Sequence, residues 1–181
     1  MTSASNDAAG RGEQIDGPFG APPEHQADHS PEQRLAALGL TLPPVTTPLA
    51  AYVPAVRTGN YVYTAGQIPV VEGQLLATGK VGAEVGAHEA TALARTCALN
   101  ALAAAASAAG SLSDIKRIVK VTGFVASAHD FAGQAQVVNG ASELLLEVFG
   151  EAGRHARSVI GAAVLPLDAP VEVELIAEVR S

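Results

Sequence analysis

The sequence predicts one α/β domain in which a single mixed β-sheet carries two long helices on one face. The chain has 181 residues, which is the length of one ordinary domain. Hydrophobic residues make up 48% of it but aromatic residues only 4%, so Ala, Val and Leu must fill the core, as suits helices lying close to a sheet. Apolar residues recur with strand and helix periods in the order ββ–α–β–α–ββ, which favours two helices packed on one sheet.

The N-terminal residues 1–30 differ from the rest of the chain. They contain five acids and one base and show no apolar periodicity, so we expect a disordered acidic tail before a domain at 31–181. His25 and His29 are one helical turn apart, but a pair without further ligands favours solvated tail residues over a metal site. A short helix is predicted at 31–40, because Pro31 stands in its first turn and Gly39 near its end.

The first half of the domain predicts a hairpin, a helix and a strand. Two strand-like runs at 51–56 and 61–64 flank Gly59-Asn60, a pair typical of a tight turn. Small apolar residues spaced by three and four predict an amphipathic helix from 86 to 109, ended by Gly110. β-Branched residues at 115–125 then predict a strand. Cys97, on the apolar face of the helix, is expected to be a buried and inert thiol.

The second half predicts a helix followed by two strands. Asn139-Gly140 favours a turn locally, but the pattern of SELLLEVFG continues a helix, so we predict one helix at 134–149 capped by Gly150. Strands are predicted at 158–164 and 171–179, the second with strictly alternating apolar and mainly acidic residues. The face of the sheet away from the helices then needs a cover, and self-association supplies one.

Composition excludes several classes of protein. The net charge of −7 opposes binding to phosphate backbones, so we expect no nucleic-acid partner. No run approaches the ~18 consecutive apolar residues of a membrane span, and the N-terminus lacks the features of a secretory signal. Cys97 is the single cysteine, which excludes an intramolecular disulfide and a multi-cysteine zinc site. We therefore expect a soluble cytoplasmic protein.

Three strings of the sequence occur in an order known from one family. They are YVPAVRTGNYVYTAGQIPV, VKVTGFVASAHDF and ARSVIGAAVLPLDAPVEVELIAEV, and over about residues 45–180 they resemble the RidA/YjgF/UK114 family, also called L-PSP. The resemblance implies a chorismate-mutase-like fold assembled as a homotrimer with clefts between subunits. It also implies hydrolysis of reactive 2-imino and enamino acids to keto acids and ammonia, a form of metabolite damage control. The family needs no cofactor and no metal.

The same resemblance marks five candidate site residues. Arg157 matches the family's carboxylate-binding arginine, and a guanidinium can grip a carboxylate through two parallel hydrogen bonds. Glu172 matches the glutamate thought to orient the attacking water. Tyr52 matches a pocket tyrosine, Gly66 a glycine whose backbone approaches the substrate, and Asn139 an asparagine that reaches the cleft from a helix. The alternatives are a surface ion pair for Arg157, an ordinary polar-face acid for Glu172 and a strand aromatic for Tyr52.

Neighbouring residues and departures from the family pattern leave the activity open. Two alternatives stand for Arg154 and His155: they are solvated loop residues, or they form a basic patch in which His155 acts as a general acid. Ala65 stands where many relatives have serine, and Val159 where many have cysteine.

Three functions follow in order of preference. The first is an enzyme, a 2-iminobutanoate/2-iminopropanoate deaminase-like hydrolase, because orientation and a polarised water suffice for imine hydrolysis. The second is a non-enzymatic module that binds a small carboxylate metabolite as a sensor or sink, which Ala65 and Val159 favour. A ribonuclease comes last, because the chain is acidic and lacks a paired set of catalytic histidines.

Overall fold

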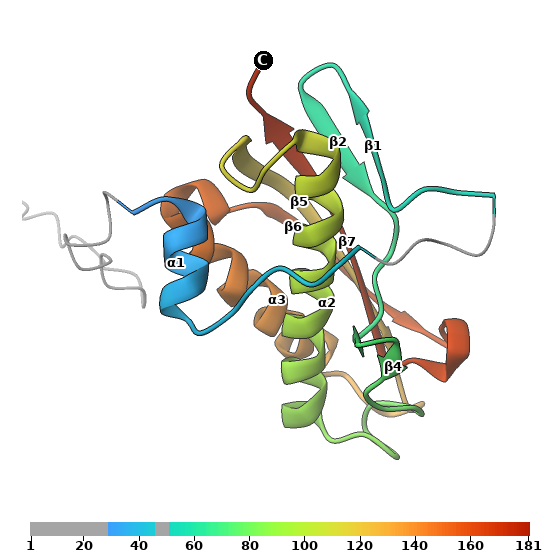
Figure 1. The fold of residues 1–181 in the computed structure, drawn as a ribbon. Coiled ribbons are helices and arrows are strands. Elements are labelled where there is room, and N and C mark those ends of the chain that lie inside the picture. The colour runs from blue at the N-terminus through green and yellow to red at the C-terminus, as the bar shows by residue number, and fades with distance from the viewer. Residues whose placement is uncertain (1–28, 46–50) are drawn as a thin grey trace, which may run out of the picture.

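A computed structural model describes residues 29–45 and 51–181, so the predicted tail up to residue 28 lies outside the described residues. Its helices gather on one face of a five-stranded sheet (Figure 1). The helices are α1 (Pro31–Ala37), α2 (Ala87–Ala109) and α3 (Gln134–Phe149), and the 3₁₀ turns are η2 (Gly150–Gly153) and η3 (Pro166–Asp168). The strands are β1 (Ala55–Thr58), β2 (Tyr61–Thr64), β3 (Val70–Val71), β4 (Gln74–Leu75), β5 (Ile115–Ala126), β6 (Ala156–Ala162) and β7 (Val171–Val179).

The main sheet has the strand order β1-β2-β7-β5-β6 and confirms the predicted mixed architecture. β5 and β6 are parallel and joined through α3, whereas the other neighbouring pairs are antiparallel. β7, the last strand, lies in the middle, so the C-terminal segment closes the sheet. β6 is left as an edge strand beside α3.

The core lies between the sheet and the helices α2 and α3. Along β7 the buried residues alternate with partly exposed ones, as the sequence pattern predicted: Val171, Val173, Leu175, Ala177 and Val179 are buried. α2 is long and apolar enough to pass for a membrane span, but 56% of its most apolar window is buried inside this fold, as expected of a core helix. Cys97 on α2 is fully buried, as predicted, and burial raises the pKa of its thiol.

Gly140 explains why the turn-like pair Asn139-Gly140 sits inside a helix. A Cβ at Gly140 would lie 2.0 Å from the backbone oxygen of Thr91 on α2, so only glycine allows the two helices to come this close. The prediction of one helix at 134–149 is confirmed to the residue, and Gly150 ends it with a φ of 58°. Gly140 is therefore explained by the close packing of α3 against α2, and it does not mark a turn that breaks the helix.

The hairpin strand predicted at 51–56 is wrong in its bounds. β1 runs from Ala55 to Thr58, because the two-residue turn Gly59-Asn60 pairs Thr58 with Tyr61 and thereby fixes the register. Pro54 has no N–H to donate, and its carbonyl accepts the last bond of this ladder from the amide of Ala65.

Two further differences concern short strands. β6 begins two residues earlier than predicted and ends at Ala162, where its partner β5 also ends at Ala126. The sequence reasoning missed the two-residue strands β3 and β4, which flank a turn at Glu72-Gly73 where both residues have positive φ. Such short strands leave too little periodicity to detect.

α1 begins at a capping box in which Ser30 and Gln33 each bond the other's backbone. It covers seven of the ten residues predicted for it and ends before Gly39, whose φ is 71°. Leu35 is buried in the core, and the Glu32 carboxylate accepts hydrogen bonds from Ser113 in the loop before β5. The helix thus belongs to the packed domain.

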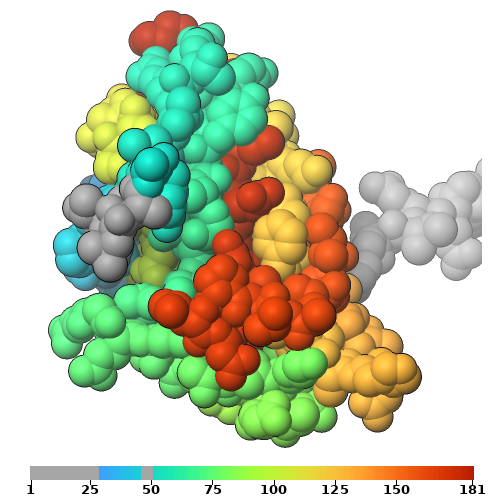
Figure 2. Space-filling view, turned by 90° about the vertical axis from the view of Figure 1, so that its right-hand side faces the viewer, coloured from blue at the N-terminus to red at the C-terminus, as the bar shows by residue number. Residues whose placement is uncertain are grey.

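The face of the sheet opposite the α-helices, which we call the open face, is not covered by α1, α2 or α3 (Figure 1), and Figure 2 views the molecule from this side. Strand alternation places on it the partly exposed residues of β7, which include Glu172 and Ile176. Apolar side chains from several strands are exposed there, with fractions of 53% for Val56, 44% for Tyr63 and 46% for Ile160. Exposed apolar patches of this kind are typical of surfaces at which proteins associate.

Candidate functional site

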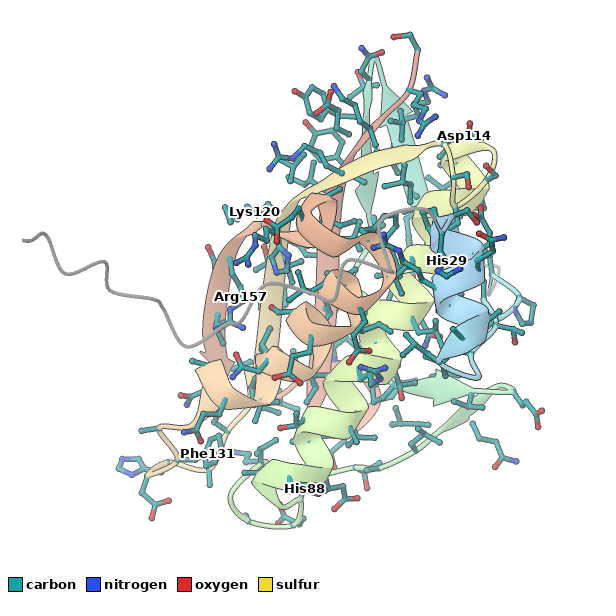
Figure 3. The ribbon with its side chains drawn as sticks, turned by 90° about the vertical axis from the view of Figure 1, so that its left-hand side faces the viewer. His29, His88, Asp114, Lys120, Phe131 and Arg157 are labelled. Carbon is teal, nitrogen blue, oxygen red and sulfur yellow. The ribbon has the colours of Figure 1, made fainter. Side chains whose placement is uncertain are left out.

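Arg157 is the second residue of the edge strand β6 and lies beside α3 (Figure 3). It pairs in register with Val121 of β5, whose buried side chain faces the helices, so Arg157 points to the same side. Its Nη1 donates hydrogen bonds to Asn139 Oδ1 at 2.8 Å and to Ser142 Oγ at 3.1 Å. Two neutral oxygens of α3 thus hold one side of the guanidinium.

The other side of this guanidinium has no partner among the described residues. The ion pairs of the described residues join Arg95 to Glu147, Lys116 to Glu178 and Arg154 to Glu151, and none involves Arg157. Its Nε and Nη2 make no hydrogen bond within residues 29–45 and 51–181. These two N–H groups form the fork that fits a carboxylate. The alternative of a surface ion pair for Arg157 does not hold in this part of the chain.

Ser142 connects Arg157 to His155. The Ser142 Oγ lies 3.0 Å from His155 Nε2, and His155 Nδ1 lies 2.6 Å from the carbonyl oxygen of Gly153. Burial of the imidazole lowers the pKa of His155, the hydrogen bond to the Gly153 carbonyl opposes this in part, and the nearby charge of Arg157 adds a smaller lowering. His155 is thus not a freely solvated loop histidine.

These side chains line a pocket of about 260 Å³ between α3 and the start of β6. Its walls are Ser142, Leu146, Gly153, Arg154, His155 and Arg157. Arg154 donates to Glu151 at 2.8 Å, and both are largely exposed, so this pair contributes little to stability. Sequence reasoning missed Ser142, although it lies three residues after Asn139 and therefore on the same face of α3.

Glu172 lies on the open face and covers Gly66. A Cβ at Gly66 would lie 1.7 Å from Glu172 Oε1, so the glycine provides the space for this carboxylate. Burial raises the pKa of Glu172, and the neighbouring charge of Glu174 raises it further. A carboxylate with this environment accepts a proton more readily than an ordinary surface acid.

Tyr52 stands before β1 with 58% of its surface exposed. The backbone bond from the Ala65 amide to the Pro54 carbonyl (2.8 Å) ties this segment to the residue before Gly66. The structure therefore groups the segment of Tyr52 with Gly66 and Glu172, and it groups Asn139 with Arg157.

One chain does not bring these two groups together. Glu172 pairs with Phe124 and Arg157 pairs with Val121, so the two lie three residues apart along the strands and two strands apart across the sheet. This spacing corresponds to about 14 Å between their Cα atoms. Their side chains also point to opposite faces. A single small molecule cannot contact both residues of the same chain.

Two other features of the site bear on its chemistry. Val159, on the same side of β6 as Arg157, packs partly buried against the core, so this position is filled by an apolar side chain. Within residues 29–45 and 51–181, no three His, Cys, Asp or Glu side chains gather in a way that could hold a metal ion.

Comparison with known proteins identifies the family. Residues 32–179 match the family model described as "YjgF/chorismate_mutase-like, putative endoribonuclease". This match includes α1 as well as the region after residue 45 that carries the sequence motifs. Because it spans most of the chain, the protein belongs to the RidA/YjgF family, and its mixed sheet with helices is the chorismate-mutase-like fold of that family.

Particular relatives are similar over most of their own length. Protein TCP17 of Trypanosoma cruzi is 41% identical over 81% of this chain and 92% of the relative. The 2-iminobutanoate/2-iminopropanoate deaminase of Escherichia coli is 36% identical over 71% of this chain and 88% of the relative.

Among solved structures, Atu1372 of Agrobacterium tumefaciens, a protein of unknown function, has a TM-score of 0.77. It is 46% identical over 83% of this chain and 92% of that protein. E. coli TdcF with bound serine has a TM-score of 0.55 and is 30% identical over 75% of this chain and 92% of that protein.

Proposed function

We propose that the protein binds small 2-imino and 2-oxo acids and hydrolyses the imines to keto acids and ammonia. The observation that carries this proposal is the Nε/Nη2 fork of Arg157, which has no partner among the described residues and which Asn139 and Ser142 hold in place from the other side. A guanidinium held by neutral groups keeps its full charge for a carboxylate ligand. The similarity to a deaminase that acts on 2-imino acids supports the same chemistry.

Glu172 would manage the protons of the reaction. Water adds to the C=N carbon and loses a proton, and the resulting carbinolamine releases ammonia after protonation of its nitrogen. The raised pKa of Glu172 suits a group that accepts the first proton and returns it to the leaving nitrogen. Gly66, which leaves room for the carboxylate, keeps this group close to the backbone of the cleft.

The complete site would lie between two subunits. Arg157 and Glu172 of one chain point to opposite faces of the sheet, so they act on one substrate only if they come from different subunits. The apolar open face provides the surface for assembly, and a homotrimer is the arrangement that the family resemblance implies. Tyr52, Gly66 and Glu172 of one subunit would then face Arg157 of the next. The TdcF structure with bound serine supports a small amino-acid-like ligand.

A binding module without catalysis is the second candidate. Ala65 offers no hydroxyl beside Gly66, and Val159 is an apolar filler beside Arg157. Such a protein would hold keto acids in the same cleft and leave imines intact.

An assay with freshly generated imine separates these functions. An amino-acid oxidase produces the imine, and keto-acid and ammonia release is measured with and without the protein; acceleration by the wild type supports the enzyme, and binding without acceleration supports the module. Arg157→Ala should abolish binding and turnover, a loss of about 2–5 kcal/mol, and Arg157→Lys should restore little because an ammonium lacks the fork.

Arg154→Ala is the matched control for this assay. It removes an arginine of the same pocket that is already paired with Glu151, so it should leave both readouts nearly unchanged. Wild-type turnover in a folded Arg157→Ala protein would place the site elsewhere.

A further inference from the structure

A chain of hydrogen bonds leads from the guanidinium of Arg157 to a histidine behind it. Arg157 Nη1 donates to Ser142 Oγ at 3.1 Å, Ser142 Oγ lies 3.0 Å from His155 Nε2, and His155 Nδ1 lies 2.6 Å from the Gly153 carbonyl. His155 is two residues from Arg157 and therefore lies on the same side of the chain. The proposed function uses Ser142 only to hold Arg157 in place, and it gives His155 no role.

The partners of His155 determine where its proton lies. A carbonyl oxygen only accepts hydrogen bonds, so Nδ1 carries the proton in the neutral ring and Nε2 is an acceptor. The hydroxyl of Ser142 must then donate to Nε2, while its lone pair accepts from Arg157. In this state the Ser142 proton is engaged by His155 and is not available to a ligand.

Protonation of His155 reverses the bond to Ser142. Nε2–H then donates to Oγ, which accepts from both His155 and Arg157, and the hydroxyl proton becomes available to the pocket that Ser142 lines. A second positive charge also appears beside the guanidinium. Both changes favour an anion in the pocket.

We propose that His155 is a positioning residue of the carboxylate site, acting through Ser142, and that binding of a carboxylate at Arg157 is coupled to proton uptake by His155. This inference rests on the proposed function, because it needs a carboxylate at Arg157. In the free protein the imidazole is neutral at physiological pH, since burial and Arg157 lower the pKa of His155. A bound carboxylate offsets the charge of Arg157 and so raises this pKa, and by linkage a protonated His155 raises affinity for the carboxylate.

The other charged side chains near His155 do not oppose the coupling between its protonation and carboxylate binding. From α3, Glu143 borders the neighbouring pocket and is exposed, and at η2 Glu151 is engaged by Arg154. From β5, Lys120 pairs with Ala156, which alternates with Arg157 and therefore faces the open side. Arg157 is the charge that lowers the pKa of His155.

Calorimetry with 2-oxobutanoate as the probe tests the coupling. Titrations from about pH 7.5 to about pH 5.5, in buffers of different ionisation enthalpy, give affinity and proton uptake together. The wild type should take up a proton on binding and gain affinity about 5-fold or more as pH falls. His155→Gln, which can accept a hydrogen bond but not titrate, should bind at neutral pH with a flat profile and no proton uptake. His129→Gln, at an exposed histidine before α3, should behave as the wild type.

A second measurement on the unmodified protein guards against a His155 variant that does not fold. Nitrogen NMR should show neutral His155 protonated at Nδ1 and should show its pKa rising when 2-oxobutanoate is added. Ser142→Ala should weaken binding and flatten the pH profile, because the link between the two side chains is lost.

The outcomes separate this inference from the proposed function. Failure of the wild type to bind any 2-oxo acid would overturn both. Binding that requires Arg157 but keeps the wild-type pH profile in His155→Gln, or a His155 pKa unmoved by the probe, would overturn the coupling alone.

Discussion

At the scale of single residues, Arg157 and Glu172 owe their properties to different surroundings. Arg157 is held by the neutral oxygens of Asn139 and Ser142, so its charge is not offset by a neighbouring carboxylate of the described residues. Glu172 is partly buried and lies beside Glu174, so its ionised form is disfavoured. The first arrangement favours binding of an anion, and the second favours transfer of a proton.

The raised pKa of Glu172 has a cost in stability. At pH values between the ordinary pKa of a glutamate and the raised pKa of Glu172, the folded protein binds more protons than the unfolded chain. Stability therefore falls as the pH rises through this window. The penalty is complete once the pH lies above the raised pKa. Glu172→Gln should therefore raise the melting temperature at neutral pH, and this gain should vanish below the ordinary carboxyl pKa.

The same variant should lose catalysis while it keeps its ligand. Keto-acid binding should survive in Glu172→Gln, but imine hydrolysis should fall by ~10²-fold or more, because glutamine cannot accept a proton. Thermal melts over a range of pH check the stability, and ammonia release checks the turnover. If Glu172 is an ordinary acid of a polar face, Glu172→Gln will change neither the pH dependence of melting nor the rate of imine hydrolysis.

Residue-scale prediction from sequence rested on the family motifs. The resemblance placed Asn139 in the cleft, which stays a prediction, and the structure shows that Asn139 accepts a hydrogen bond from Arg157. Ser142 was missed because a serine inside a helix carries no signal of its own; only its spacing from Asn139 places it beside the guanidinium. The position of Glu172 over Gly66 depends on how two distant segments meet, which no local pattern encodes.

At the scale of elements, the fit of α3 against α2 depends on Gly140. A methyl group there would meet the Thr91 backbone oxygen, which cannot move without shifting a helix. We expect Gly140→Ala to destabilise the protein by about 1–3 kcal/mol or more, measured by chemical denaturation. Gly161→Ala is the matched control, because its nearest heavy atom would be 3.4 Å away and the cost should be small. Equal stability of the two variants would contradict the packing argument.

The elements show which patterns in the sequence determine structure. Long periodic segments set the bounds of α2 to within one residue and those of α3 and β7 to the residue. The observed bounds of β1 and β6 differ from the predicted ones, because hydrogen-bonding partners, rather than composition, decide where a strand ends. For β3 and β4, which are too short to show a period, the feature that could have indicated a hairpin is the turn at Glu72-Gly73.

At the scale of the whole molecule, the open face should decide assembly. Val56 and Val71 are both strand valines with exposed side chains, at 53% and 45%, but only Val56 lies on the open face. Val56→Glu should weaken the homotrimer because it places a charge in an apolar interface. Val71→Glu should leave it intact.

Sedimentation equilibrium checks this, since the assembled protein should have three times the chain mass of 18.3 kDa. A wild type that remains monomeric at micromolar concentration would contradict the proposed assembly.

The placement of Arg157 and Glu172 on opposite faces has a consequence for mixtures of defective chains. Under the proposed assembly, a homotrimer of Arg157→Ala would have no complete cleft, and neither would one of Glu172→Gln, since each cleft would draw one residue from each of two neighbours. Unfolding and refolding the two inactive proteins together would produce hybrids in which some clefts unite an intact arginine with an intact glutamate. Such hybrids should regain part of the wild-type turnover, whereas the two proteins mixed without subunit exchange should remain inactive. Complementation between alleles would then follow from the proposed assembly, because its catalytic unit would be the boundary between chains.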